Sequence, residues 1–504
     1  MHVVGVGALA FMLLQQVTIS GRVGGAFGVP TQHQTKITNV VSSSSSTSIV
    51  ATWQTSYAAS SSLACGLASG SYNIVAVDTT DAQTLTHQSI VAGLQSATTY
   101  YCQASSVTGT QTDTSTFTAT TLPEQASTPI TGLSLGPISF YDSINPANQM
   151  WGDTYYNCKS NDGTTYVTSD DTTGWVENGN AYPGSQSPIL LAKFTSEAPL
   201  AGLTVNSFPG YGVGSRPTGD DNRSEKSSGL FCMNGKIFMA IGRQTNIATG
   251  GMGTATAFTQ GSGQVIWSPD HGVSWNNFQQ PATFNPQGEV TEPASAAMFG
   301  SVPTNMGSAT FVMYCGDDGT LGYQNPCNRH DNGDAYVYLM ANDGYWDSGN
   351  ALYLARVPRA KLASLSAADY QFYRGGDGRL DSSWGQQANA AAVISNPGKL
   401  GEPSVQYVPA LNRYLLLTFS YPQGLSAADL HSEHTLWLGY EAPHPWGPWT
   451  LINSMEWPTQ GYYNPIILND TTYSGTTPTV MFTGNFMVAP VYDMLLSTMS
   501  IEHQ

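Results

Sequence analysis

Two acidic residues stand at equivalent points of a recurring sequence pattern. Asp153 ends the run MWGD and Glu402 lies in the run LGEPSV, and each precedes a segment that we expect to form a strand. Glycoside hydrolysis needs one carboxyl group to protonate the leaving oxygen and a second to activate water or attack. If the two strands open on one cavity, these residues supply both groups. The alternative is structural, since buried acids also bond backbone amides at such positions.

Side chains suited to binding a sugar flank the two acids. The predicted substrate-binding residues are Trp151, Tyr155, Lys226, Arg243, Tyr462, Tyr463 and Asn464. The aromatic rings would offer flat faces to sugar rings. Lys226 and Arg243 would instead face uronate carboxylates if the protein were a polysaccharide lyase. The acidic balance of the chain disfavours an anionic polymer as substrate.

A loop rich in Asp and Asn is the one candidate for a metal site. Asp317, Asp318 and Asp331 are its predicted ligands, because Ca²⁺ prefers hard oxygen donors. The spacing is not that of an EF-hand, and a polar loop closed by a disulfide explains the same residues. We therefore predict no required cofactor, with Ca²⁺ as an option at this loop.

The elements that must position these groups recur five times after residue 145. The middle strand of each unit is strongly apolar, and a second strand that ends in charged residues follows it. The five middle segments read TTYVTSDD, KIFMAIGR, AYVYLMAND, RYLLLTFSY and TVMFTGNF. Repeated antiparallel sheets of this size predict a propeller with five blades. A large jelly roll explains the strands but not the fivefold recurrence.

The run SPDHGVSW, residues 268–275, fits the Asp-box pattern S-x-D-x-G-x-x-W. Asp270 would bond its own turn and Gly272 would adopt a positive φ. Trp275 would fill the gap between strands. This motif is common in sugar-active propellers and its role there is structural, so Asp270 is not a catalytic candidate.

Residues 33–121 predict a second, smaller β-domain. About seven short alternating strands lie between runs of Ser, Thr and Gly, which is typical of a β-sandwich. The run LQSATTY, residues 94–100, resembles the corner of fibronectin type III domains, and Trp53 stands where that family keeps a core tryptophan. The resemblance implies that Tyr100 ties the corner to the backbone. The fold class is therefore all-β, with a fibronectin III-like β-sandwich preceding a five-bladed β-propeller.

Composition and charge exclude several functions and indicate export. The chain has 504 residues and a net charge of −17, with only 10% charged residues, so a basic nucleic-acid surface is excluded. The apolar run at residues 3–14 is too short to span a bilayer and predicts a signal peptide over 1–28. The predicted order is then the sandwich at 33–121, a linker at 122–144 and the propeller at 145–504.

Six cysteines and no CxxC pair favour disulfides over zinc. We expect the pairs Cys65–Cys102 and Cys315–Cys327 because each is local. Cys158 and Cys232 are the two cysteines left over, and we expect them to form the third pair. Disulfides agree with a secreted protein.

The second half of the chain also carries a family resemblance. The runs ALYLARVPR (351–359), YQFYRGGDG (370–378), GEPSVQYVPALNRYLLLTF (401–419) and HPWGPWT (444–450), with Trp384, look like the domain-of-unknown-function 4185 family. Those proteins are five-bladed propellers related in shape to glycoside hydrolase family 43, and some are endo-acting on D-arabinan. The resemblance implies that Asp153 is the base and Glu402 the acid. Candidates for a third, tuning acid are Asp221, Glu292 and Asp334, of which Asp334 is preferred.

Together these observations predict a secreted, monomeric glycoside hydrolase that acts on a polysaccharide. The family resemblance implies that this polysaccharide is arabinan-like. The alternative is a non-catalytic carbohydrate-binding or cell-surface adhesion protein whose propeller mouth binds glycans through aromatic residues. No nucleic acid and no membrane span are expected.

Overall fold

The structure is a computed structural model, and it describes most of the chain from residue 34 to residue 504. Its description omits 142–148, 151, 178–179, 195, 198–199, 202–203, 208–222, 247–257, 261–262, 277–297, 300–302, 305, 315–330, 334, 344–346, 422–433, 470–474 and 485–491. The predicted signal peptide, residues 1–28, lies outside the described residues. No helix in the described part of the chain is long and apolar enough to cross a bilayer.

The N-terminal domain is a β-structure built around one long strand. Its strands are β1 (Ile37–Ser44), β2 (Ser48–Gly66), β3 (Ile74–Val75), β4 (Thr80–Ala92), β5 (Thr99–Thr108) and β6 (Gln111–Thr120). The first part of β2 pairs mainly with β1 and β4, whereas its end pairs with β3 and β5, and β5 pairs with β6. Both parts of β2 bury side chains in one core, which includes Trp53 and Leu63. The disulfide Cys65–Cys102 joins β2 to β5, as predicted.

Tyr100 has the structural role that its position implies. Its ring is buried, and its hydroxyl oxygen accepts a hydrogen bond from the backbone N–H of Gln95 at 2.9 Å. The contact ties the start of β5 to the crossing that precedes it. Trp53 lies in the same core and donates from Nε1 to Ser106 Oγ at 2.8 Å. Assignment of this domain to the fibronectin type III family stays a prediction.

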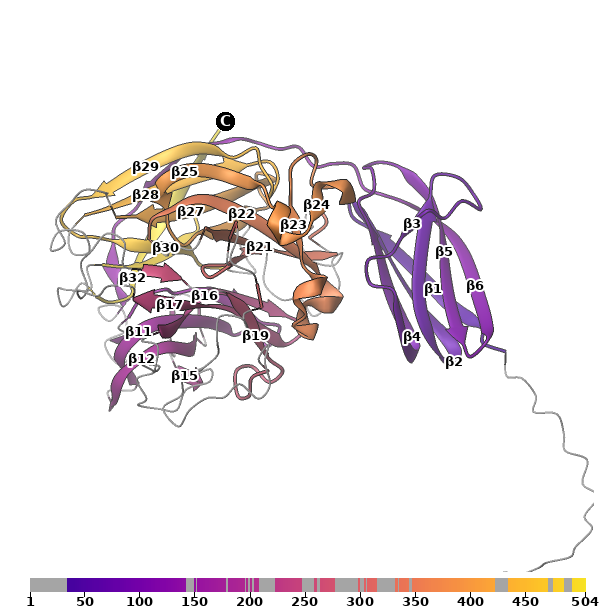
Figure 1. Ribbon diagram of the computed structural model, residues 1–504, viewed down its shortest axis with the longest axis horizontal. Coiled ribbons are helices and arrows are strands. Elements are labelled where there is room, and N and C mark those ends of the chain that lie inside the picture. Colours follow the sequence, from indigo (N-terminus) through magenta and orange to yellow (C-terminus); the bar gives the residue numbers. More distant parts are fainter. Residues whose placement is uncertain are drawn as a thin grey trace, which may run out of the picture. The chain divides into compact units, whose positions relative to one another are not determined.

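Five blades of antiparallel strands follow, and together they form a propeller in which the third and fourth blades are joined into one ten-stranded sheet. The first contains β10 (Asn157–Lys159), β11 (Thr165–Glu177), β12 (Asn180–Phe194) and β15 (Thr204–Ser207), with β9 (Gln149–Met150) beside β11. The second contains β16 (Arg223–Met233), β17 (Lys236–Asn246), β18 (Phe258–Gln260) and β19 (Gln264–Ser268). A separate short hairpin pairs β13 (Ser196–Glu197) with β14 (Leu200–Ala201). Figure 1 shows β16, β17 and β19 close together.

The remaining three blades complete the ring. Blade three contains β20 (Thr310–Met313), β21 (Tyr336–Asn342), β22 (Gly349–Pro358), β23 (Gln371–Tyr373), β24 (Trp384–Gly385) and β25 (Ala392–Leu400). Blade four contains β26 (Ser404–Val408), β27 (Arg413–Ser420), β28 (Thr435–Ala442) and β29 (Thr450–Trp457). Blade five contains β30 (Tyr463–Ile467), β31 (Thr479–Thr483) and β32 (Leu495–His503). All five predicted middle segments are second strands of these sheets, which confirms the predicted repeats.

The middle strands β17, β21, β27 and β31 are largely apolar because both faces of each blade are covered, whereas β11 also buries Thr168, Ser169 and Asp170. Successive side chains of a strand point to opposite faces. In β27, Leu415 and Leu417 pack in the core shared with blade five, whereas Leu416 packs in the core shared with blade three. A strand buried on both faces reads as a continuous apolar run rather than as an alternating one.

The ring is closed by a segment from before the first blade. β7 (Ile130–Leu135) pairs antiparallel with β32, and β8 (Ser139–Phe140) pairs with the start of β32. Residues 122–144, predicted as a linker, therefore contribute two strands to the last blade. Joining strands from the two ends of the propeller ties its first and last blades together.

The innermost strands bring the start of every blade to one end of the ring. Neighbouring inner strands β10, β16, β20, β26 and β30 contact one another in that order. β20 and β26 run parallel, with Val312 opposite Val405. Because the inner strands share a direction, residues just before them gather at one end of the propeller. The second strand of each blade is antiparallel to the first, so residues at its end reach the same place.

The prediction for the Asp box can be checked in detail. In the Asp box, Asp270 accepts hydrogen bonds from the backbone N–H and the hydroxyl of Ser274, and Gly272 has a φ of 93°. The structural role of Asp270 is therefore confirmed. Outside the blades, two short 3-10 segments follow β22, η2 (Arg359–Ser364) and η3 (Ala367–Asp369).

Candidate functional site

Asp153 lies just before β10 and its carboxylate is surrounded by hydroxyl donors. Oδ1 accepts a hydrogen bond from Thr154 Oγ1 at 2.9 Å. Oδ2 accepts from the hydroxyls of Tyr463 and Tyr492 at 2.7 and 3.2 Å. Donors to a carboxylate favour its charged form. The side chain is thus built to carry a negative charge although only 9% of the residue is exposed.

Glu402 lies just before β26, three blades further on, and connects to the same network. Asn464 Nδ2 donates to Glu402 Oε2 at 3.3 Å and to Thr154 Oγ1 at 3.1 Å. Thr154 Oγ1 donates in turn to Asp153 Oδ1 at 2.9 Å. Because the three bonds measure 2.9, 3.1 and 3.3 Å, Asp153 Oδ1 and Glu402 Oε2 lie at most 9.3 Å apart. Glycosidases separate their two carboxyl groups by about 5 to 9.5 Å.

The two linking residues both have left-handed backbones. Thr154 has a φ of 60° and Asn464 a φ of 53°. A β-branched residue such as Thr is rare at positive φ, and such a conformation costs on the order of 1–3 kcal/mol. The fold sustains this strain at two residues that contact each other and aim their side chains at the acids. Strained backbone of this kind concentrates at functional sites.

The tyrosines at the site stay protonated and can only act as neutral groups near neutral pH. Burial, followed by the nearby charge of Asp153, raises the pKa of Tyr463 well above its usual value. Burial, followed by the charges of Glu402 and Asp170, does the same to the pKa of Tyr156. Tyr463 therefore keeps its proton and donates a hydrogen bond to Asp153 Oδ2. Tyr156 donates to the carbonyl oxygen of Pro403, the residue after Glu402, at 3.0 Å.

One protein family matches most of the propeller. The model of the family described as "Domain of unknown function (DUF4185)" covers residues 140–477. The chain belongs to the DUF4185 family. No curated protein matches this DUF4185 chain.

Solved structures show distant similarity to this DUF4185 protein. Levansucrase from Bacillus subtilis is 12% identical with a TM-score of 0.37, over 73% of this chain and 91% of that one. A mutant of the GH43 protein BlXynB from Bacillus licheniformis is 9% identical with a TM-score of 0.35, over 69% and 50%. A GH43 β-xylosidase/α-arabinofuranosidase from a compost microbial metagenome is 11% identical with a TM-score of 0.32, over 70% and 91%. These scores are low, so the fold of the DUF4185 protein rests on its own strand pairing.

The predicted sugar-stacking tyrosines have other roles in the DUF4185 protein. Tyr155 is fully buried and donates to the carbonyl oxygen of Gly152 at 2.7 Å, so it offers no ring face to a sugar. This corrects the prediction for Tyr155. Tyr463 is also buried and acts through its hydroxyl on Asp153. Tyr462 is half-buried and packs edge-on against Trp457 and Phe482. These rings pack inside the protein instead of facing a sugar, and the sequence pattern does not show which aromatic residues are buried.

The predicted basic residues are placed on blade two. Lys226 lies on β16 and is 6% exposed, and its charge acts on Asp170. Arg243 lies on β17 opposite Glu225, and its side chain is not described. Several further predicted residues lie outside the described residues: Trp151, Asp221, Glu292, Asp317, Asp318, Asp334, Cys315 and Cys327. The disulfide Cys158–Cys232 joins β10 to β16, as predicted.

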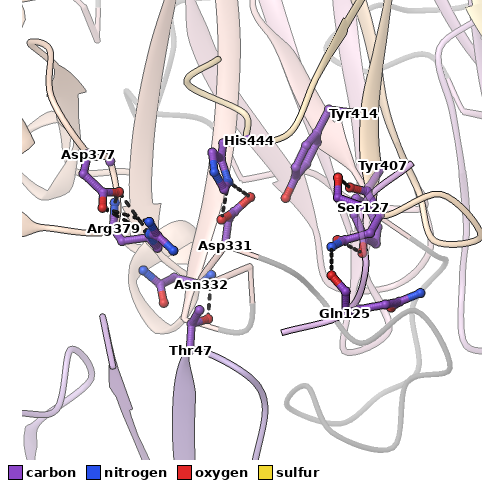
Figure 2. Close-up of polar contacts among 12 residues, drawn as sticks. Thr47, Gln125, Ser127, Asp331, Asn332, Asp377, Arg379, Tyr407, Tyr414 and His444 are labelled. Atoms are coloured by element: carbon purple, nitrogen blue, oxygen red, sulfur yellow. Dashed lines mark hydrogen bonds and ion pairs between the residues drawn. The ribbon is translucent and has the colours of Figure 1, made fainter. Parts of the chain in front are cut away.

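Asp331, a predicted calcium ligand, lies away from the two acids and pairs with a histidine. It precedes β21, so it lies at the end of blade three opposite the start of β20. Figure 2 shows His444 facing Asp331, with Nδ1 at 2.9 and 3.0 Å from the two carboxylate oxygens. The next residue, Asn332, donates from its backbone N–H to Thr47 Oγ1 of the N-terminal domain. Among the described residues, no group of three or more His, Cys, Asp or Glu could hold a metal ion.

The structure adds acids that the sequence search missed. Asp170 lies near the middle of β11, where its backbone pairs with that of Asp153. Asp347 lies between β21 and β22, at the end of the ring where Asp153 and Glu402 lie. After burial, the charges of Asp347 and Asp153 both raise the pKa of Tyr421. Asp347 could have been found by reading the ends of second strands as well as the starts of first strands. In an antiparallel sheet these two points meet at one edge.

Proposed function

We propose that this protein is a secreted glycoside hydrolase that cleaves a polysaccharide at the end of the propeller where the inner strands begin. Glu402 is the general acid and Asp153 is the general base. The observation that carries this proposal is the hydrogen-bonded connection through Asn464 and Thr154. It keeps Asp153 Oδ1 and Glu402 Oε2, from blades one and four, at most 9.3 Å apart, which is below the largest separation that glycosidic chemistry uses, about 9.5 Å.

The surroundings of the two acids support their different roles. Asp153 accepts from three hydroxyl groups, which favours its ionised form and hence its role as base. Glu402 is 3% exposed, and burial favours the neutral form of a carboxyl group that must donate a proton. Two acids held in unlike environments are the arrangement that acid and base catalysis requires.

The buried aromatic residues favour hydrolysis over simple glycan binding. A non-catalytic binding protein would present open aromatic faces at the propeller mouth. Tyr155 and Tyr463 are buried instead, and Tyr463 serves the Asp153 carboxylate. An arabinan-like polymer is the preferred substrate class, on the family resemblance of the second half of the chain. The disulfides support an extracellular protein, since such bonds persist in oxidising compartments.

The test is a screen of the purified protein against plant, fungal and mycobacterial polysaccharides, with detection of new reducing ends. We expect cleavage of at least one polymer by the wild-type protein. Glu402→Gln should lower kcat by about 10²-fold or more, because the general acid is lost while the side chain keeps its size. Glu456→Gln, at an exposed site on β29, is the matched control and should cleave normally. Unchanged turnover by folded Glu402→Gln would remove the assignment.

A further inference from the structure

A third carboxyl group is built into the wall of the site. Asp170 lies on β11 and is 1% exposed. Its backbone exchanges two hydrogen bonds with Asp153, one from Asp153 N–H at 2.9 Å and one from Asp170 N–H at 2.7 Å. The position of the general base is therefore fixed by the strand that carries Asp170.

The side chain of Asp170 is held by the neighbouring blade. Ser227, on β16, donates from its backbone N–H to Oδ2 and from its hydroxyl to Oδ1, both at 2.9 Å. Ser227 is completely buried. One residue of blade two thus fixes both carboxyl oxygens, so the carboxyl group cannot turn without breaking two buried bonds. A buried polar group that loses such partners costs free energy that the fold does not recover elsewhere.

The charged groups around Asp170 come from three blades. Lys226 faces it from β16, Asp153 from the segment before β10, and Glu402 from the segment before β26. On β12, its strand partner is the apolar Ile189. Burial raises the pKa of Asp170 well above its usual value. The charges of Asp153 and Glu402 raise it further, whereas Lys226 and the Ser227 hydroxyl lower it.

Three carboxyl groups and one lysine therefore share a site from which water is largely excluded. Like charges in such a site interact strongly, so the ionisation of one carboxyl group opposes that of the others. The effect is reciprocal, and the protons come off in steps that belong to the cluster rather than to single residues. Lys226 supplies one positive charge against three potential negative charges.

We propose that Asp170 is a positioning residue for the two catalytic carboxyl groups: it anchors Asp153 to blade two through Ser227 and couples its own charge to those of Asp153 and Glu402. This inference deepens the proposed function and rests on it for its catalytic meaning. The charge coupling itself exists whether or not the protein cleaves a glycan. That difference allows the two ideas to be tested apart.

The test compares the full-length wild-type protein with Asp170→Asn by infrared titration of the carboxyl groups. Asp153→Asn and Glu402→Gln assign the bands. Asp170→Asn removes a carboxyl group that shares protons with the other two, so we expect the Asp153 and Glu402 bands to titrate at lower pH, by about half a unit or more, over the range in which Asp170 ionises in the wild type. Asp162→Asn, in the turn between β10 and β11, is the matched control and should shift neither band.

A second readout uses catalysis once a substrate is known. Both limbs of the profile of kcat/KM against pH should move to lower pH in Asp170→Asn. If this variant does not fold, Ser227→Ala keeps Asp170 but weakens the support of its charged form, and should shift the bands in the same direction by less. Titrations of Asp170→Asn that superimpose on those of the wild type would overturn the proposal. If the bands shift but the wild-type protein cleaves no polymer, the charge coupling of Asp170 stands and the proposed hydrolase function is rejected.

Discussion

Asn464 Nδ2 lies 3.3 Å from Glu402 Oε2 and 3.1 Å from Thr154 Oγ1, so one amide group of blade five spans from blade four to blade one. Its other polar atom, Oδ1, is buried and has no hydrogen-bond partner among the residues that the structure describes. A buried acceptor left open costs free energy unless something fills it. Asn464 is therefore the first residue to change.

We predict that Asn464→Ala lowers kcat/KM at least tenfold, since Glu402 loses a donor and Thr154, which donates to Asp153, loses the amide that holds its hydroxyl oxygen. Alanine is also disfavoured at the positive φ of this residue. Asn412→Ala is the matched control, because Asn412 is equally buried, has a φ of 51° and lies in the turn between β26 and β27. Steady-state kinetics of both variants, measured at a temperature at which both are fully folded, distinguish a loss of catalysis from a loss of stability. Equal activity losses in both variants would reduce Asn464 to a structural role.

Tyr463→Phe removes the hydroxyl that donates to Asp153 while keeping the ring packed against Phe419 and Tyr421. The ionised form of the base loses one of its donors, so a higher pH is needed to reach it. We expect the acid limb of kcat/KM against pH to move to higher pH. Tyr407→Phe, which removes a hydroxyl that donates to Asn412 Oδ1, should cost about 1 kcal/mol of stability and leave the profile in place. An unmoved acid limb in Tyr463→Phe would argue that Asp153 is not the base.

Asp347 makes the stability of the fold depend on pH. Burial raises the pKa of this carboxyl group to about 6. An acid with a raised pKa stabilises the folded state while protonated, and that contribution is lost as the pH rises from about 4 through about 6. Asp347→Asn should match the wild type near pH 4 and exceed it by up to about 3 kcal/mol near pH 7. Denaturant unfolding at the two pH values is the measurement, and equal differences at both would contradict the assignment.

The disulfide Cys158–Cys232 holds the first two inner strands together and closes a separation of 74 residues. Replacing both cysteines by alanine should lower the free energy of unfolding by about 2–4 kcal/mol and reduce activity, because Asp153 and Ser227 lie on the joined segments. Removing Cys65–Cys102 in the same way should destabilise the N-terminal domain and spare the activity of the folded propeller. Thermal unfolding and kcat of both double variants test this difference. Equal kcat losses would show that the propeller depends on the N-terminal domain instead.

The sequence by itself determined the architecture. The fivefold recurrence of a middle segment and its partner predicted the blades, and four of the five middle segments are largely apolar, as strands buried on both faces tend to be. The same logic predicted that Asp153 and Glu402 stand at the starts of inner strands. Local chemistry also sufficed for the Asp box and for the corner of Tyr100, since their partners lie within a few residues.

Only the tertiary structure decided which side chains meet. Tyr155 and Tyr463 look alike in sequence as sugar platforms, yet packing buries both, and only Tyr463 reaches an acid. Asp170 carried no motif, because its partner Ser227 is 57 positions away on another blade. β7 completes the last blade although it precedes the first. Contacts between distant segments depend on how the blades close into a ring, and no local pattern of residues encodes that closure.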